Sequence, residues 1–208
     1  MVHFAIAEKV CAGDPCPHFL IGSIAPDAIH ARPESTREDK GRTHFVNNGI
    51  MPTTGEIGQN AVLYSSRNDS PEWKAFVRGY ISHVYADLRW TETLYTAYET
   101  SFHEGLTDIR STYNQEVSQI EFLLMKSESW TESVIAKLKV VEALPLTPLI
   151  EAYEIHAYRD AKIKWLLHAH NEPGIELTYF KEANVRNFIS QTAKELKELF
   201  SQWGIQTI

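Results

Sequence analysis

The fold of this chain is decided by the stretch Arg78-Gly-Tyr-Ile-Ser-His-Val-Tyr-Ala-Asp-Leu-Arg-Trp-Thr91, whose pattern predicts a helix that carries His83 and Asp87. Their spacing of four residues is about one helical turn, so the imidazole and the carboxylate project from the same face. The neighbours on that face are mostly apolar: Tyr80, Val84 and Leu88. A nitrogen donor and an oxygen donor at this spacing form half of a metal site, although a His–Asp hydrogen bond inside a helix bundle accounts for the same pair.

The hydrophobic fraction of 43% and the five Trp, nine Tyr and nine Phe residues indicate one globular domain over residues 1–208. No apolar run is long enough for a transmembrane segment, and the start of the chain is amphipathic rather than a signal peptide. We therefore expect a cytoplasmic protein in which Cys11 and Cys16 are reduced thiols. The net charge of −7, with no basic cluster, disfavours nucleic acid as a partner.

Hydrophobic periodicity predicts an all-α, multi-helix bundle, because no alternating strand pattern of useful length occurs. Helix starts are indicated by Ser70-Pro71, by Thr147-Pro148 and by a capping box formed by Ser129 and Glu132. The predicted helices are 3–10, 19–24, 72–98, 109–125, 129–144, 149–168 and 178–204. Residues 31–71 are polar and rich in Pro, Gly, Asn and Ser, so we expect a long loop there with a short apolar island at 43–46.

The first half of the chain supplies five metal-type donors in apolar or small-residue surroundings: His3, Asp27, His44, His83 and Asp87. Burying such groups without partners would cost a few kcal/mol apiece, so they must satisfy one another or share a cation. Three imidazoles and two carboxylates suit zinc first, and another divalent transition metal also fits. The donors suffice for two ions with Asp87 as a bridge, and His30 nearby is left open as a ligand.

These donors lie in segments that resemble, in order, the ligand motifs of the zinc-dependent phospholipase C family, which has single-strand nuclease and nucleotidase relatives. The segments are His3, Gly22-Ser-Ile-Ala-Pro-Asp27, Thr43-His44-Phe45 and Gly79-Tyr-Ile-Ser-His83-Val-Tyr-Ala-Asp87. The resemblance covers about residues 1–125, which would form the metal-binding core, while 126–208 would complete the bundle. It implies a helical bundle with a metal cleft.

The resemblance also implies roles for the donors. Asp27, His44, His83 and Asp87 would hold one zinc ion, Asp87 would bridge, and His3 would help to hold a second ion. Asp27 is in addition the candidate for orienting or deprotonating the attacking water.

The chain departs from the family pattern in two places. It begins Met1-Val2-His3, where secreted family members have a processed tryptophan whose amine and carbonyl bind zinc. The family's remaining zinc ligands have no clean counterpart among the later donors, so we expect one or two ions. Whether any of these donors completes a further site is left open: His103, Glu104, Asp108, Glu116 and Glu121.

We therefore expect a metal-dependent hydrolase in which zinc-bound hydroxide attacks the phosphorus of a small-molecule or lipid-derived phosphate ester. Arg32 would stabilise the transition state, and His30 and Lys40 could also meet the phosphate; ordinary solvated charges account equally well for these three. A helical binding or scaffold protein with a structural zinc site is the alternative.

A nucleotide phosphohydrolase of the His-Asp type is disfavoured, because that dipeptide does not occur. Tyr113 either reaches the cleft or lies in the core. A second pair with four-residue spacing, His156 and Asp160, lies among charged residues and is predicted to be at the surface.

Overall fold

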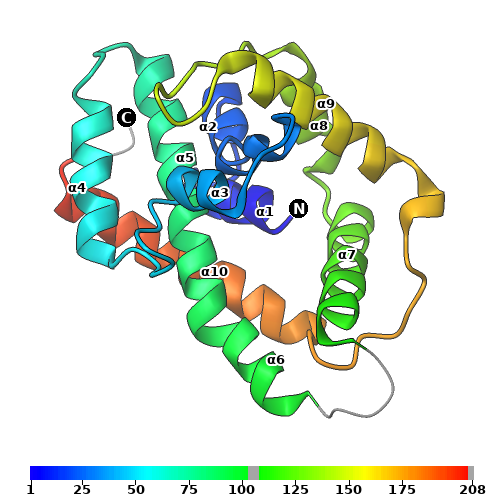
Figure 1. Cartoon of the computed structure of the whole chain (residues 1–208). Helices are drawn as coiled ribbons and strands as arrows, with labels where there is room; N and C mark the ends of the chain where they lie inside the picture. The colour runs from blue at the N-terminus through cyan, green and yellow to red at the C-terminus, as the bar shows by residue number, and fades with distance from the viewer. Residues whose placement is uncertain (103–107, 206–208) are drawn as a thin grey trace.

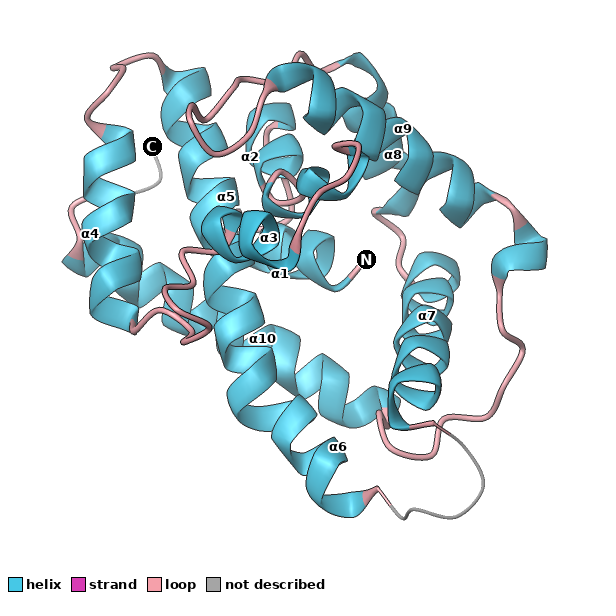
Figure 2. Ribbon diagram, in the orientation of Figure 1, coloured by secondary structure: helices cyan, strands magenta, loops and turns pink. Residues whose placement is uncertain are grey.

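A computed structural model describes residues 1–102 and 108–205, and within these ranges the protein is all-α with no β-strand, as predicted (Figures 1 and 2). The α-helices in this part of the chain are α1 (Val2–Val10), α2 (Pro17–Gly22), α3 (Arg37–Thr43), α4 (Thr54–Ser65), α5 (Pro71–Trp90), α6 (Thr96–Ser101), α7 (Ile109–Ser127), α8 (Thr131–Val140), α9 (Ala152–Leu167) and α10 (Glu182–Gln202). Short 3-10 helices span Pro26–Ala31 and Ala169–Asn171. The described ranges contain no helix with both the length and the apolar character needed to cross a bilayer.

Helix α5 is the central element of the structure. It starts as predicted, because the Ser70 side chain accepts a hydrogen bond from the Trp73 backbone N–H and Pro71 occupies the first turn. Helices α1, α2, α4 and α10 all pack against it. The π-helical segment Thr91–Tyr95 joins it to α6, so the predicted helix 72–98 is one continuous run whose last part changes its hydrogen-bonding pattern (Figure 1).

Helices α2 and α5 touch backbone to backbone through Gly22 and Gly79. A Cβ atom on Gly22 would lie 2.2 Å from the Phe76 carbonyl oxygen, and one on Gly79 would lie 2.1 Å from the Phe19 carbonyl oxygen. Glycine is therefore required at both positions, because any side chain would force the helices apart. The contact brings the Ser23 carbonyl, just after α2, within hydrogen-bonding distance of a side chain on α5.

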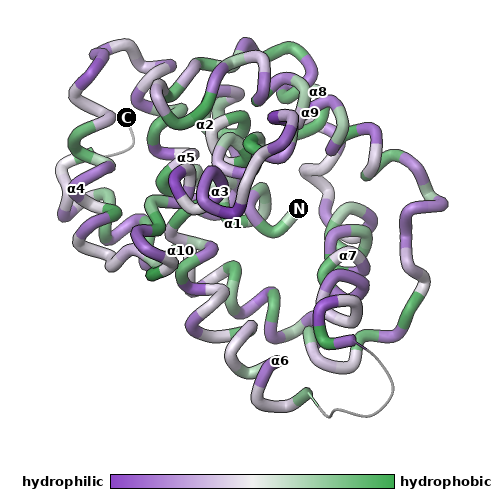
Figure 3. The backbone as a smooth tube through the Cα atoms, viewed as in Figure 1, coloured by the Kyte–Doolittle hydropathy of each residue, from purple (hydrophilic) through white to green (hydrophobic). Residues whose placement is uncertain are grey.

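Apolar residues recur along most of the helices and alternate with polar ones, as the hydropathy colouring shows (Figure 3). The buried apolar side chains form one continuous cluster that includes residues from α1, α2, α5, α9 and α10. Helix α9 packs against the 3-10 helix Pro26–Ala31, and α1 packs against α10. The C-terminal helices therefore cover the segments that carry the predicted metal donors.

The prediction that residues 31–71 form a loop was wrong, because two helices, α3 and α4, lie within it. Both begin with capping boxes, formed by Thr36 with Asp39 and by Thr53 with Glu56. The Thr-x-x-Asp and Thr-x-x-Glu spacings of these boxes are legible in the sequence. The polar composition hid them, because α3 buries only Thr43 among its residues.

Three helix starts in the second half of the chain were also predicted wrongly. Helix α8 begins at Thr131 without a capping box at Ser129. Helix α9 begins only at Ala152, because residues around Pro148 form a turn closed by a hydrogen bond from the Leu146 N–H to the Ile150 carbonyl. Helix α10 begins at Glu182 rather than near 178, since the N–H groups of Thr178, Tyr179 and Phe180 bind the carboxylate of Glu116 instead.

The α2–α5 contact gives a testable expectation for stability. We expect Gly79→Ala to lower the free energy of unfolding by about 3 kcal/mol or more, because the new methyl group meets backbone atoms that cannot move aside. Gly55→Ala is the matched control, since Gly55 lies in the exposed first turn of α4 with its nearest neighbouring atom at 3.9 Å, and it should be neutral or slightly stabilising. Chemical denaturation measures both, and equal stabilities would contradict the close contact.

Candidate metal centre

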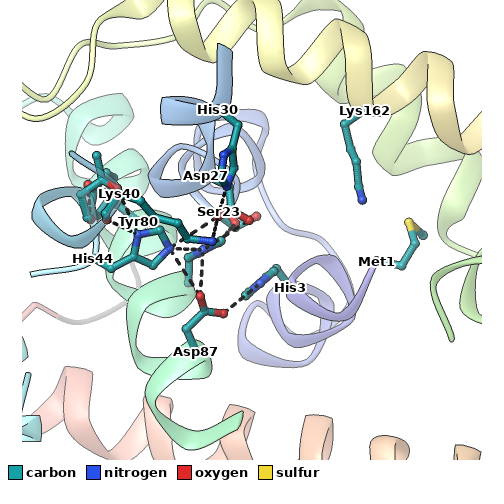
Figure 4. A network of polar contacts seen from close by, with 12 residues as sticks. Met1, His3, Ser23, Asp27, His30, Lys40, His44, Tyr80, Asp87 and Lys162 are labelled. Atoms are coloured by element: carbon teal, nitrogen blue, oxygen red, sulfur yellow. Dashed lines mark hydrogen bonds and ion pairs between the residues drawn. The ribbon is translucent and has the colours of Figure 1, made fainter. Parts of the chain in front are cut away.

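The five predicted donors come together at one place, from four separate segments (Figure 4). His3 lies on α1, Asp27 on the 3-10 helix Pro26–Ala31, and His44 caps the C-terminus of α3. His83 and Asp87 lie on α5 one turn apart, as their spacing predicts. Pro26 starts the 3-10 helix, and the resulting break in the backbone directs the carboxylate of Asp27 towards α5.

His83 is held in one tautomer by the α2–α5 contact. The residue is only 1% exposed, and its Nδ1 lies 2.8 Å from the Ser23 carbonyl oxygen. A carbonyl oxygen can only accept a hydrogen bond, so Nδ1 carries the proton and donates it. In the neutral ring, Nε2 therefore presents its lone pair to the other donors.

His44 is oriented in the same way by its own helix. Its Nδ1 lies 3.0 Å from the Lys40 carbonyl oxygen, and its Nε2 lies 3.2 Å from Nε2 of His83. When both rings are neutral, two lone pairs face each other at that distance and repel. A proton or a metal ion between the two nitrogens would remove the repulsion, so the geometry favours a cation at this point.

Two carboxylates lie beside the facing imidazoles. Asp87 Oδ2 lies 3.4 Å from His44 Nε2 and 3.6 Å from His83 Nε2, while Asp27 Oδ1 lies 3.5 Å from His44 Nε2. In tetrahedral zinc sites, bonds of about 2.0–2.1 Å place neighbouring ligand atoms about 3.3 Å apart. The ligand atoms of Asp27, His44 and His83 all lie within 4.8 Å of one another, so these three side chains could hold a divalent ion. Asp87 borders this group through its contacts with both imidazoles.

His3 lies on the other side of Asp87. Its Nε2 is 3.5 Å from Asp87 Oδ1, the carboxylate oxygen that does not face His44, and its ring stacks on that of His83 with centroids 3.9 Å apart. The buried Nδ1 of His3 makes no hydrogen bond with any residue that the structure describes. Two groups of side chains could hold an ion: the first is His3, His83 and Asp87, and the second is Asp27, His44 and His83. Asp87 lies between them, with Oδ1 facing His3 and Oδ2 facing His44.

The charges of the cluster depart from those of isolated side chains. Burial alone would raise the pKa of both aspartates, but the neighbouring imidazoles outweigh it and lower the pKa of Asp87 to about 2 and that of Asp27 well below its usual value. Burial, with the nearby His83, lowers the pKa of His3 to about 3. Burial opposes the charge on His44 as well, but its hydrogen bonds to the two carboxylates have the larger effect and raise its pKa to about 9. In the metal-free protein at neutral pH, a proton on His44 thus fills the role that a metal ion would take.

This competition between proton and metal sets the pH dependence of metal affinity. A metal ion needs neutral His44, so we expect zinc affinity to rise by about tenfold per pH unit from pH 7 and to level off near pH 9. Zinc titrations against a chromophoric chelator measure this, and His156→Ala, which removes an imidazole bound to Glu142, should keep the slope. Affinity that is flat over this range would contradict a protonated His44.

The same shift affects the stability of the metal-free protein. The pKa of His44 is higher in the folded state than the usual imidazole value of 6.5, so its protonation stabilises the fold fully below pH 6.5. The stabilisation disappears as the pH rises towards 9. Unfolding in the presence of a chelator should therefore show lower stability at pH 9 than at pH 6.5, and His44→Ala should remove this difference.

Arg32 does not join the cluster. Its guanidinium binds the carboxylate of Glu154 on α9, with Nε 2.6 Å from Oε1 and Nη2 3.1 Å from Oε2. Glu154 is fully buried, so its charge depends on this partner. The structure therefore places Arg32 in a link between the N-terminal segments and α9.

Because Arg32 is bound to Glu154, we expect a substitution of Arg32 to change mainly the stability of the protein and not its binding of a substrate. We expect Arg32→Ala to lower the free energy of unfolding by about 2–3 kcal/mol, because it leaves a buried carboxylate without its charged donor. Arg42→Ala, which removes an exposed guanidinium paired with Asp39, should cost less than about 1 kcal/mol. Urea denaturation compares the two, and equal losses would mean that the Arg32–Glu154 pair contributes no more than a surface pair.

Within the described ranges, the remaining residues that the sequence offered as possible metal ligands lie outside the cluster of five donors or have other partners. His30 lies at the rim, half exposed, with Nε2 4.0 Å from Asp27 Oδ1. Asp108 caps α7, Glu116 binds three backbone N–H groups, and Glu121 pairs with the Met1 amine at 2.8 Å and with Lys162 at 2.5 Å. Glu104, like His103, lies outside the described residues.

A cavity of about 270 Å³ adjoins the cluster and is lined by His3, Asp27, His83 and Asp87. Its walls also include Tyr113, for which the sequence allowed a place either in the cleft or in the core. Four further lining residues were not predicted from the sequence: Trp90, Tyr158, Lys162 and Phe188. The last three belong to α9 and α10, and no local pattern distinguishes them from ordinary helix residues. His156 and Asp160, the second spaced pair, lie away from the cavity, and the side chain of Asp160 is 65% exposed.

No protein-family model, curated protein or solved structure matches this chain. The chemistry open to the site follows from its own donors, imidazoles and ionised carboxylates, of which His3, Asp27, His83 and Asp87 line the cavity. Such a set can bind a divalent cation and leave room beside it for a small ligand.

Proposed function

We propose that this protein is a metal-dependent phosphoric-ester hydrolase, similar to the zinc-dependent phospholipases C. The observation that carries the proposal is the pair of imidazole Nε2 atoms of His44 and His83, which face each other 3.2 Å apart between two ionised carboxylates. Two histidines and two aspartates are ligands that zinc accepts, and the order of their segments along the chain is that of the family's motifs.

Asp27, His44, His83 and Asp87 would hold the first ion, and His3 with the second oxygen of Asp87 would contribute to another. A divalent ion bound there would polarise the phosphoryl oxygen and lower the pKa of a nearby water molecule, which is what phosphate-ester hydrolysis requires. His3 is suited to its part because burial keeps it neutral, so no proton has to leave its ring before it binds a cation.

Asp27 is the residue that would orient the attacking water and take its proton. Its carboxylate is ionised at neutral pH, and its Oδ1 is buried at the cavity wall. A carboxylate in this state accepts hydrogen bonds only, so it fixes the direction of a water O–H group. The nearby Lys40 ammonium and His44 ring, each 3.5 Å from Oδ1, keep the carboxylate in place.

The cavity favours catalysis over a purely structural metal site. Structural zinc is enclosed by protein ligands, whereas catalytic zinc keeps an open side. Here the aspartate side chains retain partial exposure, 25% for Asp27 and 33% for Asp87, and both line the cavity. Its volume of about 270 Å³ suits a small phosphate ester or a head group rather than a polymer enclosed along its length.

Asp87→Asn tests the proposal, because the amide keeps the shape of the side chain while removing its charge. We expect zinc content and the hydrolysis of 4-nitrophenyl phosphate esters to fall together, activity by about 100-fold or more. Asp160→Asn is the matched control on the exposed second pair and should change neither quantity. Zinc-loaded wild-type protein without any esterase activity would favour the scaffold alternative, and full zinc content in Asp87→Asn would exclude the assigned site.

A further inference from the structure

Lys40 stands on a fixed piece of backbone beside the metal centre. Its helix, α3, is capped by Thr36 and Asp39, and the last residue, Thr43, accepts a hydrogen bond from the buried hydroxyl of Tyr80 at 2.5 Å. The Lys40 carbonyl accepts the hydrogen bond from His44 Nδ1 that orients the ligand ring. The backbone of Lys40 is therefore positioned by the same contacts that position His44.

The side chain of Lys40 reaches from α3 towards Asp27 and lines the cavity (Figure 4). Its Nζ lies 3.5 Å from Asp27 Oδ1, and the side chain is 46% exposed. Asp27 is shared, because His44 Nε2 lies 3.5 Å from the same oxygen and His83 Nε2 lies 3.9 Å from Oδ2. The ammonium group is thus held at the cavity by a carboxylate that also contacts two imidazole rings.

Arg32 and Lys162 are each bound to a largely buried carboxylate. Arg32 is bound by the buried Glu154, and Lys162 lies 2.5 Å from Glu121, which also binds the Met1 amine. Releasing either cation would leave a largely buried carboxylate with one donor fewer, which is costly. Lys40 has no such constraint, since a divalent ion bound to Asp27 would take over the neutralisation of that carboxylate and would repel the ammonium.

We infer that Lys40 is the phosphate-binding residue of this cavity and that it makes the site prefer the dianionic phosphate of a small monoester to a monoanionic diester. The inference rests on the proposed function and specifies its substrate class. A monoester offers an additional charged, non-bridging oxygen, and the attraction of the ammonium for the phosphate grows with the charge on the phosphate. A diester has only one charge, so it gains less from Lys40.

The test compares two substrates with the same leaving group, 4-nitrophenyl phosphate and methyl 4-nitrophenyl phosphate, in zinc-loaded protein. We expect Lys40→Met to lower kcat/KM for the monoester by about 10- to 100-fold and for the diester by less than about threefold. Inorganic phosphate, titrated by calorimetry, should bind more weakly by the same factor as the monoester loses. Zinc content should be unchanged, and Lys40→Arg should restore most of the phosphate affinity.

Lys74→Met is the matched control. Lys74 is also a half-exposed lysine paired with an aspartate, with Nζ 2.9 Å from Asp69 Oδ1 and 41% exposure, but it does not line the cavity. This variant should keep the wild-type rates, phosphate affinity and zinc content.

Each failure has its own signature. Equal losses for both esters, unchanged phosphate affinity, or loss of zinc in Lys40→Met would overturn the role of Lys40. Wild-type protein that hydrolyses the diester but not the monoester would overturn the inference and leave the proposed function intact. If zinc-loaded protein cleaves neither ester, the proposed function and the substrate preference that rests on it both fail, and phosphate titrations of wild type and Lys40→Met then decide whether Lys40 binds phosphate.

Discussion

The close contact between α2 and α5 is the constraint on which the metal centre depends. Because Gly22 and Gly79 have no side chains, the two backbones meet directly, and the Ser23 carbonyl comes within 2.8 Å of His83 Nδ1. That hydrogen bond fixes which nitrogen of His83 faces the other donors. A side-chain cluster that could bind metal is therefore set by a backbone contact on the opposite side of the ring.

The cluster is costly in the absence of a cation. Ionised carboxylates and oriented imidazoles are brought out of water, and two Nε2 atoms face each other 3.2 Å apart. In the metal-free protein, His44 is protonated at neutral pH. Burial opposes its charge, but hydrogen bonds to Asp27 and Asp87 stabilise the charged ring and raise its pKa to about 9. The arrangement of charges that could hold a divalent ion thus also holds a proton in its place.

The helices of the second half of the chain do not carry the five predicted metal donors; they hold the segments around the site together through buried ion pairs and hydrogen bonds. Buried carboxylates of α7 and α9 tie distant segments together: Glu154 holds Arg32, and Glu116 binds the N–H groups that precede α10. Glu121 links α7 to α9 through Lys162. These ties position α9 and α10, whose Tyr158 and Phe188 form part of the cavity wall together with donors of the N-terminal half.

The sequence by itself determined the helical class, because helical periodicity is a local property. It also predicted that His83 and Asp87 share a helix face, because their spacing is local as well. It also contained the capping boxes of α3 and α4, but the polar composition of residues 31–71 hid them. Only the tertiary structure decided that Arg32 pairs with Glu154, 122 residues away, while Lys40 faces Asp27. Such pairings depend on how helices dock, and docking is determined by packing between segments distant in the chain, which no local pattern records.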